Sequence, residues 1–257
     1  MTPISNNRAR LRGPIRIAPI TPKLLVSVRD RSEIADALAA GADLIDLKEP
    51  RRGPLAPADL DLWLHAASLW TDRSLGPPYL SAALGEQSDA VRVARGLPAE
   101  FAFAKVGPSH CDGAERILDL WAEIRQLLDH RIELVAVAYA DYRSARCIHP
   151  NAIFQLAADA GIQRCLIDTY IKDGQSTLQH LGIDGLTQLG SMAREAGLWW
   201  TLAGSIRLAC VAELRQHDLV PDCFGVRGDV CQRGRTGTLS SDRIGLWKKS
   251  LASLEGA

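Results

Sequence analysis

The sequence predicts an α/β fold, a single (β/α)8 TIM barrel, and three observations support this prediction. Eight short runs rich in β-branched and apolar residues alternate with Ala-rich stretches of helical pattern. Successive runs begin about 19 to 36 residues apart, which is the length of one strand and one crossover helix. A chain of 257 residues also has the usual length of such a barrel built as one domain.

The expected strands follow one another as parallel, helix-covered segments. Parallel strands that are buried on both faces have nearly continuous apolar sequences, and residues 134–138 (Leu-Val-Ala-Val-Ala) are an example. The predicted strands are 24–28, 43–48, 79–84, 101–106, 133–140, 164–168, 199–205 and 223–227.

The intervening helices have recognisable starts and ends. Asp30 is followed three residues later by Glu33, which predicts a capping box at the start of the first helix. Gly41, Gly161 and Gly197 each follow an alanine and stand two or three residues before the next expected strand. A glycine in the left-handed conformation ends a helix at such a junction. The repeated junction favours one βα architecture over two unrelated domains.

We predict that the barrel is the catalytic domain and spans residues 23–257, after a flexible N-terminal leader of residues 1–22. The leader is basic and contains proline, and it lacks an apolar core of signal-peptide length. Formal net charge is zero, with 30 basic and 30 acidic side chains, so neither nucleic acid nor an anionic membrane is an expected partner. No apolar run reaches the ~20 residues that span a bilayer.

Cysteine and histidine patterns predict neither disulfides nor a metal site. The six cysteines form no CxxC pair, and several lie in apolar runs, which indicates reduced thiols in a cytoplasmic protein. The six histidines form no HxH or HxxxH pattern, and no Walker or Rossmann glycine pattern occurs. We therefore expect no metal and no cofactor.

Polar residues recur at the carboxyl ends of the expected strands, where the open face of such a barrel holds its reactive groups. This placement indicates an active site rather than surface decoration. These residues are Ser27, Asp46, Lys48, Lys105, Tyr139, Asp141, Asp168, Ser205 and Arg227.

Asp46 and Lys48 lie two residues apart, so both side chains point to one side of the strand while Leu47 points to the other. If Leu47 faces the helices, Asp46 and Lys48 face the barrel axis. Burial lowers the pKa of a lysine toward the range in which the neutral amine is a nucleophile. The alternative interpretation is a strand-end lysine that reaches solvent and pairs with Asp46.

Lys105 ends a strongly apolar strand, where an unpaired charge is unfavourable. Two inward lysines would repel each other, so that one could act as nucleophile and the other as proton acceptor. Asp168 adds a carboxylate at another strand end, to orient an amine or carry a proton, and Lys172 follows in the loop. The alternative is a solvated strand end at Lys105 and a surface turn at Lys172.

The last two strand ends predict a phosphate site. Gly204 and Ser205 follow the seventh strand, and Gly228 follows the eighth, so backbone N–H groups can approach an anion there. Arg227 is expected to add a bidentate donor.

At these motifs the chain resembles the (5-formylfuran-3-yl)methyl phosphate synthase family of methanofuran biosynthesis. The resemblance runs from about Leu24 to Arg243 and rests on seven blocks. They are LLVSVRD, GADLIDLKEPRRGPLAP, FAKVG, AVAYADYR, LIDTYIKDG, LAGSI and GVRGDVC.

The resemblance implies a lyase reaction that condenses two glyceraldehyde 3-phosphate molecules into a furan aldehyde phosphate, with loss of phosphate and water. It implies that Lys48 forms the Schiff base and that Lys105 is the proton acceptor. Asp46, Asp168 and Lys172 match further residues of the family's site. The partner is then a phosphorylated triose, and self-association into a homo-oligomer is expected, as is common for such barrels.

Two rival interpretations remain at this stage. One is a class I aldolase-like or isomerase barrel that acts on another sugar phosphate and gives no furan. The other is a non-catalytic barrel that binds a phosphorylated metabolite.

Overall fold

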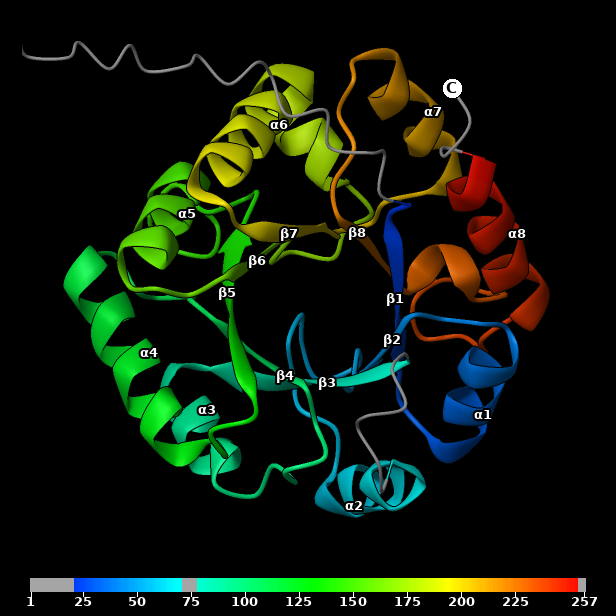
Figure 1. The fold of residues 1–257 in the computed structure, drawn as a ribbon, viewed down its shortest axis with the longest axis horizontal. Helices are drawn as coiled ribbons and strands as arrows, with labels where there is room; N and C mark the ends of the chain where they lie inside the picture. The colour runs from blue at the N-terminus through cyan, green and yellow to red at the C-terminus, as the bar shows by residue number, and fades with distance from the viewer. Residues whose placement is uncertain (1–20, 71–77, 254–257) are drawn as a thin grey trace, which may run out of the picture.

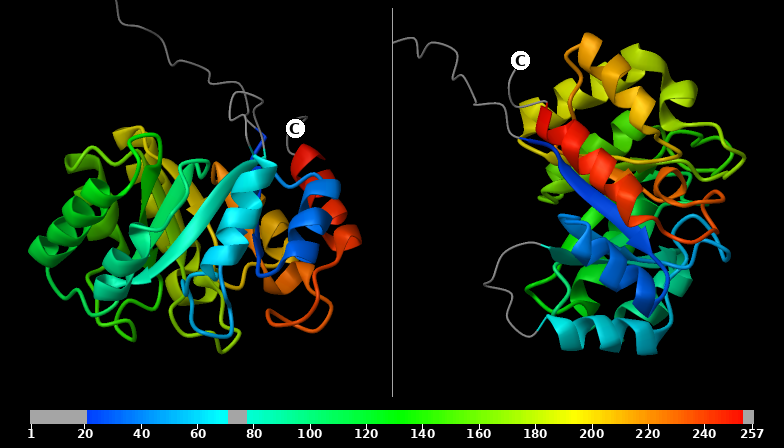
Figure 2. Two further views of the ribbon diagram at one scale, coloured as in Figure 1. Left: turned by 90° about the horizontal axis from the view of Figure 1, so that it is seen from below. Right: turned by 90° about the vertical axis from the view of Figure 1, so that its right-hand side faces the viewer.

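A computed structural model describes residues 21–70 and 78–253. Eight parallel strands pair in chain order, and the last pairs with the first, so the sheet is a closed barrel. Figure 1 is a view down the barrel and shows the helices outside the ring of strands. The side views in Figure 2 show the strands tilted inside the layer of helices. The predicted single (β/α)8 barrel is confirmed. The expected leader lies outside the described residues except for positions 21 and 22.

The barrel strands are short, as is typical of this fold. They are β1 (Lys23–Val28), β2 (Leu44–Leu47), β3 (Tyr79–Glu86), β4 (Phe103–Gly107), β5 (Glu133–Tyr139), β6 (Arg164–Asp168), β7 (Trp199–Leu202) and β8 (Cys223–Val226). The helices are α1 (Arg31–Ala39), α2 (Leu60–Leu69), α3 (Gln87–Ala94), α4 (Ala114–Leu127), α5 (Pro150–Asp159), α6 (Thr177–Ala196), α7 (Leu208–Gln216) and α8 (Ser241–Ala252), with a 3-10 turn η2 (Gly228–Val230).

Strand alternation divides the apolar side chains into two cores. One face of each strand packs against the helices, where Ile45 and Leu47 of β2 join Ile34 of α1. The other face fills the barrel interior, where Leu44, Tyr139 and other strand residues form a second apolar cluster. Because Leu47 belongs to the outer core, Asp46 faces inward, as its position in the strand predicts.

The three helix ends predicted at glycines are confirmed, whereas the predicted capping box of α1 is only half formed. Gly41, Gly161 and Gly197 have φ values of +78°, +67° and +67°. The Asp30 side chain accepts a hydrogen bond of 3.0 Å from the Glu33 amide and caps α1. The Glu33 carboxylate, however, accepts from the Arg29 amide at 2.9 Å rather than from the amide of the cap residue.

The largest difference from the predicted strands is at β7, which ends at Leu202 rather than at Ser205. Gly204 and Ser205 have φ values of +85° and +54°, and such left-handed residues cannot continue a strand. Strand β3 instead continues to Glu86, through an irregular register between Ala83 and Glu86. Both changes alter the backbone at the carboxyl end of the barrel.

Within residues 21–70 and 78–253, no helix is long and apolar enough to cross a membrane. All six cysteines are free, and Cys210 is the one that is not buried.

Candidate active site

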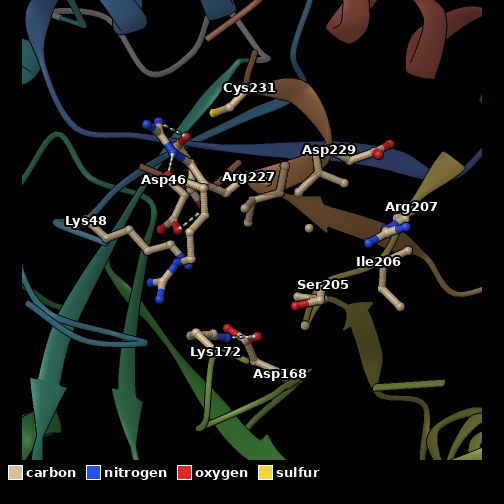
Figure 3. Close-up of a pocket in the computed structure, with 18 of the residues that line it drawn as sticks. Asp46, Lys48, Asp168, Lys172, Ser205, Ile206, Arg207, Arg227, Asp229 and Cys231 are labelled. Carbon is tan, nitrogen blue, oxygen red and sulfur yellow. Dashed lines mark hydrogen bonds and ion pairs between the residues drawn. The ribbon is translucent and has the colours of Figure 1, made fainter. Parts of the chain in front are cut away.

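A cavity of about 520 Å³ opens at the carboxyl ends of the strands, within the size range of small-molecule sites. It is lined by side chains from five of the eight strand ends and by the loops that follow them (Figure 3). The residues predicted for catalysis all line it: Asp46, Lys48, Lys105, Asp168 and Lys172. Those predicted to bind phosphate line it too: Gly204, Ser205, Arg227 and Gly228.

Lys105 and Asp46 form a buried ion pair across the barrel interior. Their side chains are 2% and 1% exposed, and the Lys105 ammonium donates a short hydrogen bond to Asp46. The second carboxylate oxygen of Asp46 accepts a bond of 3.0 Å from the Ser27 hydroxyl. A buried ion pair needs such additional hydrogen bonds to be stable. Asp46 is therefore fixed by β1 and β4, and a proton can pass between it and Lys105.

Lys48 differs from Lys105 in having no carboxylate within ion-pair distance among the described residues. Its side chain is buried, and its amine donates a weak bond of 3.4 Å to the Pro54 carbonyl. Burial lowers the pKa of Lys48 to about 8, while Asp168 and Asp46 oppose the shift and Lys172 favours it. The alternative in which Lys48 reaches solvent and pairs with Asp46 does not match this geometry.

Asp168 and Lys172 form a second ion pair on the other side of the cavity, with N–O distance 2.6 Å. The same carboxylate oxygen accepts a bond of 2.8 Å from the Thr169 amide, and the Lys172 amine lies 3.1 Å from the Thr169 hydroxyl. Burial alone would raise the pKa of Asp168, but Lys172 and Lys48 lower it below its ordinary value. Asp168 is thus held as an anion that acts electrostatically on the Lys48 amine without forming an ion pair with it.

The loop after β7 is shaped by contact with the loop after β6. A Cβ on Gly204 would lie 2.8 Å from the Thr169 nitrogen and would overlap the Thr177 hydroxyl, so no other residue fits. Thr177 also donates to this loop, through its amide to the Gly204 carbonyl at 2.9 Å and through its hydroxyl to the Ala203 carbonyl at 2.7 Å. The close approach turns the backbone toward the cavity.

The turned backbone leaves amide groups open to a ligand. Within the described part of the chain, the amides of Ser205, Ile206 and Gly228 donate to no other protein group. Ser205 projects into the cavity opposite Lys48, and Arg207 stands next to it, in Figure 3. Ser205, Ile206 and Gly228 all line the cavity, and N–H groups without protein acceptors in the loops after β7 and β8 suit an anion.

Arg227 lines the cavity but does not have the free donors that the sequence prediction assigned to it. Its side chain is 6% exposed, and its guanidinium donates to both oxygens of the buried Glu33 carboxylate. The other donors bond the carbonyls of Ser27, Arg235 and Gly237 at 2.8–3.1 Å. All five N–H groups are thus used within the protein, which corrects the expected bidentate bond to phosphate.

Two groups near the site were not singled out from the sequence. Arg235 lies in the irregular loop between β8 and α8 and lines the cavity. Glu86, at the end of β3, accepts a short hydrogen bond from the Tyr139 hydroxyl and a bond of 3.0 Å from the Ser109 amide. Burial raises the pKa of Glu86. Glu86 could have been found as a polar residue at the end of an apolar strand. It was missed because the predicted strand ended at residue 84, two residues before Glu86.

In the described ranges 21–70 and 78–253, no group of three or more histidine, cysteine, aspartate or glutamate side chains is placed to hold a metal ion. The arrangement instead combines a buried amine, paired acid–base groups and open amides. These are the components for covalent chemistry on a carbonyl that carries an anionic group.

Comparison with known proteins places the chain in a family. Residues 24–248 match the family described as 4-HFC-P synthase. The (5-formylfuran-3-yl)methyl phosphate synthase of Methanosarcina barkeri is 30% identical over 235 residues, covering 86% of this chain and 96% of the relative. The Archaeoglobus fulgidus protein of the same name is 29% identical over 230 residues, with the same two coverages.

Solved structures with a similar fold are more distant in sequence. KGPDC from Streptococcus mutans has a TM-score of 0.59 at 15% identity, covering 92% of this chain and all of that one. Phosphoribosyl anthranilate isomerase from Thermotoga maritima has a TM-score of 0.59 at 12% identity, with coverages of 90% and 99%. These similarities show the barrel fold alone.

Proposed function

The chain belongs to the 4-HFC-P synthase family of methanofuran biosynthesis, and from that premise we propose that it makes (5-formylfuran-3-yl)methyl phosphate from two glyceraldehyde 3-phosphate molecules. Its relatives are named synthases, so the chain is an enzyme. The proposal adds the reaction class and the substrate: a lyase that works through a lysine Schiff base, with loss of phosphate and water.

The observation that carries the proposal is the state of the Lys48 amine. With a pKa of about 8, about one amine in ten is neutral at pH 7, against fewer than roughly one in a thousand for an ordinary lysine. The amine opens onto a cavity and forms no ion pair within the described residues. A neutral, accessible amine is what imine formation with an aldehyde requires.

In the proposed mechanism, Lys48 forms an imine with the aldehyde carbon of one triose phosphate, which makes the neighbouring C–H group acidic. Lys105 accepts that proton after passing its own to Asp46, its hydrogen-bond partner. Asp168, which stays charged beside Lys172, stabilises the positive charge on the imine nitrogen.

We propose that the phosphate retained in the product lies between the loops after β7 and β8. The open amides of Ser205, Ile206 and Gly228 supply the donors, and Gly204 allows the backbone to approach. Arg227 contributes indirectly, because it holds the loop that begins at Gly228.

Borohydride trapping tests the function directly. The protein is incubated with glyceraldehyde 3-phosphate and borohydride, and the modified peptide is mapped by mass spectrometry. We expect an adduct on Lys48 that is lost in Lys48→Arg, which keeps the charge but cannot form the imine. We expect Lys105→Met to retain the adduct and to release neither phosphate nor a furan chromophore.

The rival activities give different results in the same assay. Phosphate release or substrate isomerisation without a furan chromophore would indicate another sugar-phosphate enzyme. Substrate binding without any adduct would indicate a non-catalytic barrel, and an adduct on another lysine would contradict the role of Lys48. Location in the cytoplasm and assembly as a homo-oligomer stay predictions.

A further inference from the structure

Hydrogen bonds from Arg227 hold the loop between β8 and α8 at the cavity. The Arg227 guanidinium donates to the Arg235 carbonyl at 2.8 Å and to the Gly237 carbonyl at 3.1 Å. The same guanidinium is fixed to Glu33 on α1. The backbone around Arg235 is thus held by a buried ion pair, and the side chain of Arg235 starts from a defined position.

The Arg235 side chain reaches from this loop to the loop after β2 and ends next to Lys48. Its guanidinium donates to the Gly53 carbonyl at 3.2 Å, and the Lys48 amine donates to the next carbonyl, that of Pro54, at 3.4 Å. Consecutive carbonyls lie about one residue length apart, roughly 3.8 Å between α-carbons. The two cationic groups are therefore neighbours on one wall of the cavity.

Unlike most of the cations around it, Arg235 has N–H groups that bind no acceptor in the described part of the protein. Lys105, Lys172 and Arg227 each bind a carboxylate. Arg235 makes one hydrogen bond, to a carbonyl, so four of its five N–H groups have no partner within the described chain. The side chain is only partly exposed and lines the cavity, so its desolvation is compensated by an anionic ligand more effectively than by water.

We propose that Arg235 binds the phosphate of the triose that is attached to Lys48, as a second phosphate subsite distinct from the one formed by Ser205 and Gly228. This proposal rests on the function proposed above, in which two phosphorylated trioses meet. In an imine on Lys48, the phosphate is attached two carbons beyond the imine carbon, which places it beside the amine rather than across the cavity. Lys48 and Ser205 face each other across that cavity in Figure 3.

In this subsite, Arg235 would also assist the elimination of phosphate from the imine. When Lys105 removes the proton from C2 of the imine, the electron pair of that C–H bond forms the C2–C3 double bond. The C3–O bond breaks, and its electrons leave with inorganic phosphate. Arg235 binds the departing dianion through its free N–H groups, so it stabilises the transition state as well as the bound triose.

The test compares a phosphorylated with an unphosphorylated aldehyde. Imine formation is trapped by borohydride with glyceraldehyde 3-phosphate and with glyceraldehyde, in the wild type, Arg235→Gln, Arg235→Lys and Arg233→Gln. Arg233 is a matched control because it is exposed in the same loop and does not line the cavity. Inorganic phosphate is titrated separately into each protein by calorimetry.

We expect the preference for glyceraldehyde 3-phosphate to fall roughly 10- to 100-fold in Arg235→Gln, the scale of a lost charge-assisted hydrogen bond. Trapping of glyceraldehyde stays unchanged, Arg235→Lys falls less, and Arg233→Gln matches the wild type. An equal loss for both aldehydes, or an unchanged preference, would overturn the proposal.

The phosphate titration separates this proposal from the proposed function. We expect two phosphate sites in the wild type and one in Arg235→Gln. If no protein forms an adduct but Arg235→Gln still loses one phosphate site, the Schiff-base function fails and the subsite stands. If the number of sites and their affinities are the same in both proteins, the subsite is wrong whatever the trapping shows.

Discussion

Burial, rather than a neighbouring base, sets the pKa of Lys48. The surrounding charges act in both directions: Asp168 and Asp46 favour the ammonium form, whereas Lys172 and Lys105 oppose it. Desolvation exceeds the sum of these effects and brings the pKa of Lys48 to about 8. The residue therefore titrates within the range of pH in which the protein can be assayed.

The rate of imine formation should thus rise with pH and level off above about pH 8, because only the neutral amine attacks the aldehyde. Asp168→Asn removes the anion that most favours the ammonium form, so we expect the pKa of Lys48 to fall and the rising limb to move to lower pH. The limb is measured by borohydride trapping of glyceraldehyde over a pH series. If the pH–rate profile of Asp168→Asn rises at the same pH as that of the wild type, or at a higher pH, Asp168 does not favour the ammonium form of Lys48.

The residues that strand periodicity governs could be predicted from the sequence. Asp46 and Lys105 lie within strands and Asp168 ends one, and all three line the cavity because side chains alternate along a strand and parallel strands end at one rim. The partner of Arg227 could not be predicted in this way. A long flexible side chain has several partners within reach, and Glu33 comes close only when the barrel has closed.

Among the elements, the loop after β7 shows how contact with a neighbouring loop ends a strand. Gly204 combines a φ of +85° with a contact that excludes a Cβ, whereas Gly161 has a φ of +67° and nothing within 4 Å of its Cβ position. A substitution at Gly161 therefore causes backbone strain alone, whereas a substitution at Gly204 causes backbone strain and steric overlap. Their difference was not predictable, because the sequence places a Gly in both junctions but does not show what lies beside it.

Gly161→Ala should lower the free energy of unfolding by about 1 kcal/mol, the cost of a left-handed alanine. Gly204→Ala should cost clearly more, because Thr169 and Thr177 must also move. It should also raise KM for glyceraldehyde 3-phosphate, since the amides of the loop are displaced. Urea unfolding and steady-state kinetics measure the two effects. Equal stability losses, or an unchanged KM in Gly204→Ala, would contradict the role of the close contact.

At the scale of the whole molecule, the buried pair of Arg227 and Glu33 joins the end of the barrel to its beginning. Arg227 follows β8, and Glu33 lies in α1 directly after β1, which is the strand that β8 pairs with. The guanidinium also holds the Ser27 carbonyl at 3.0 Å. The last strand is therefore attached to the first by side chains as well as by the sheet.

Loss of this pair should destabilise the whole barrel. Arg227→Met leaves the buried Glu33 carboxylate with only the longer ion pair to Arg29, at 3.5 Å, and we expect a loss of about 3 kcal/mol in the free energy of unfolding. Adding Glu33→Gln removes that charge and should restore part of the loss. Denaturant unfolding of the two single variants and the double variant measures the coupling. Simple addition of the two single losses would mean that the residues act independently.

Because the last strand closes the ring, the pKa of Lys48 is lowered only late in the synthesis and folding of the chain. During translation Lys48 leaves the ribosome long before residues 225–235, which line the cavity beside it. Because burial is the largest cause of its lowered pKa, the nascent chain carries this lysine as an ordinary ammonium ion. The larger neutral fraction of the amine exists only in the folded barrel, so aldehydes meet a mostly protonated side chain until the ring has closed.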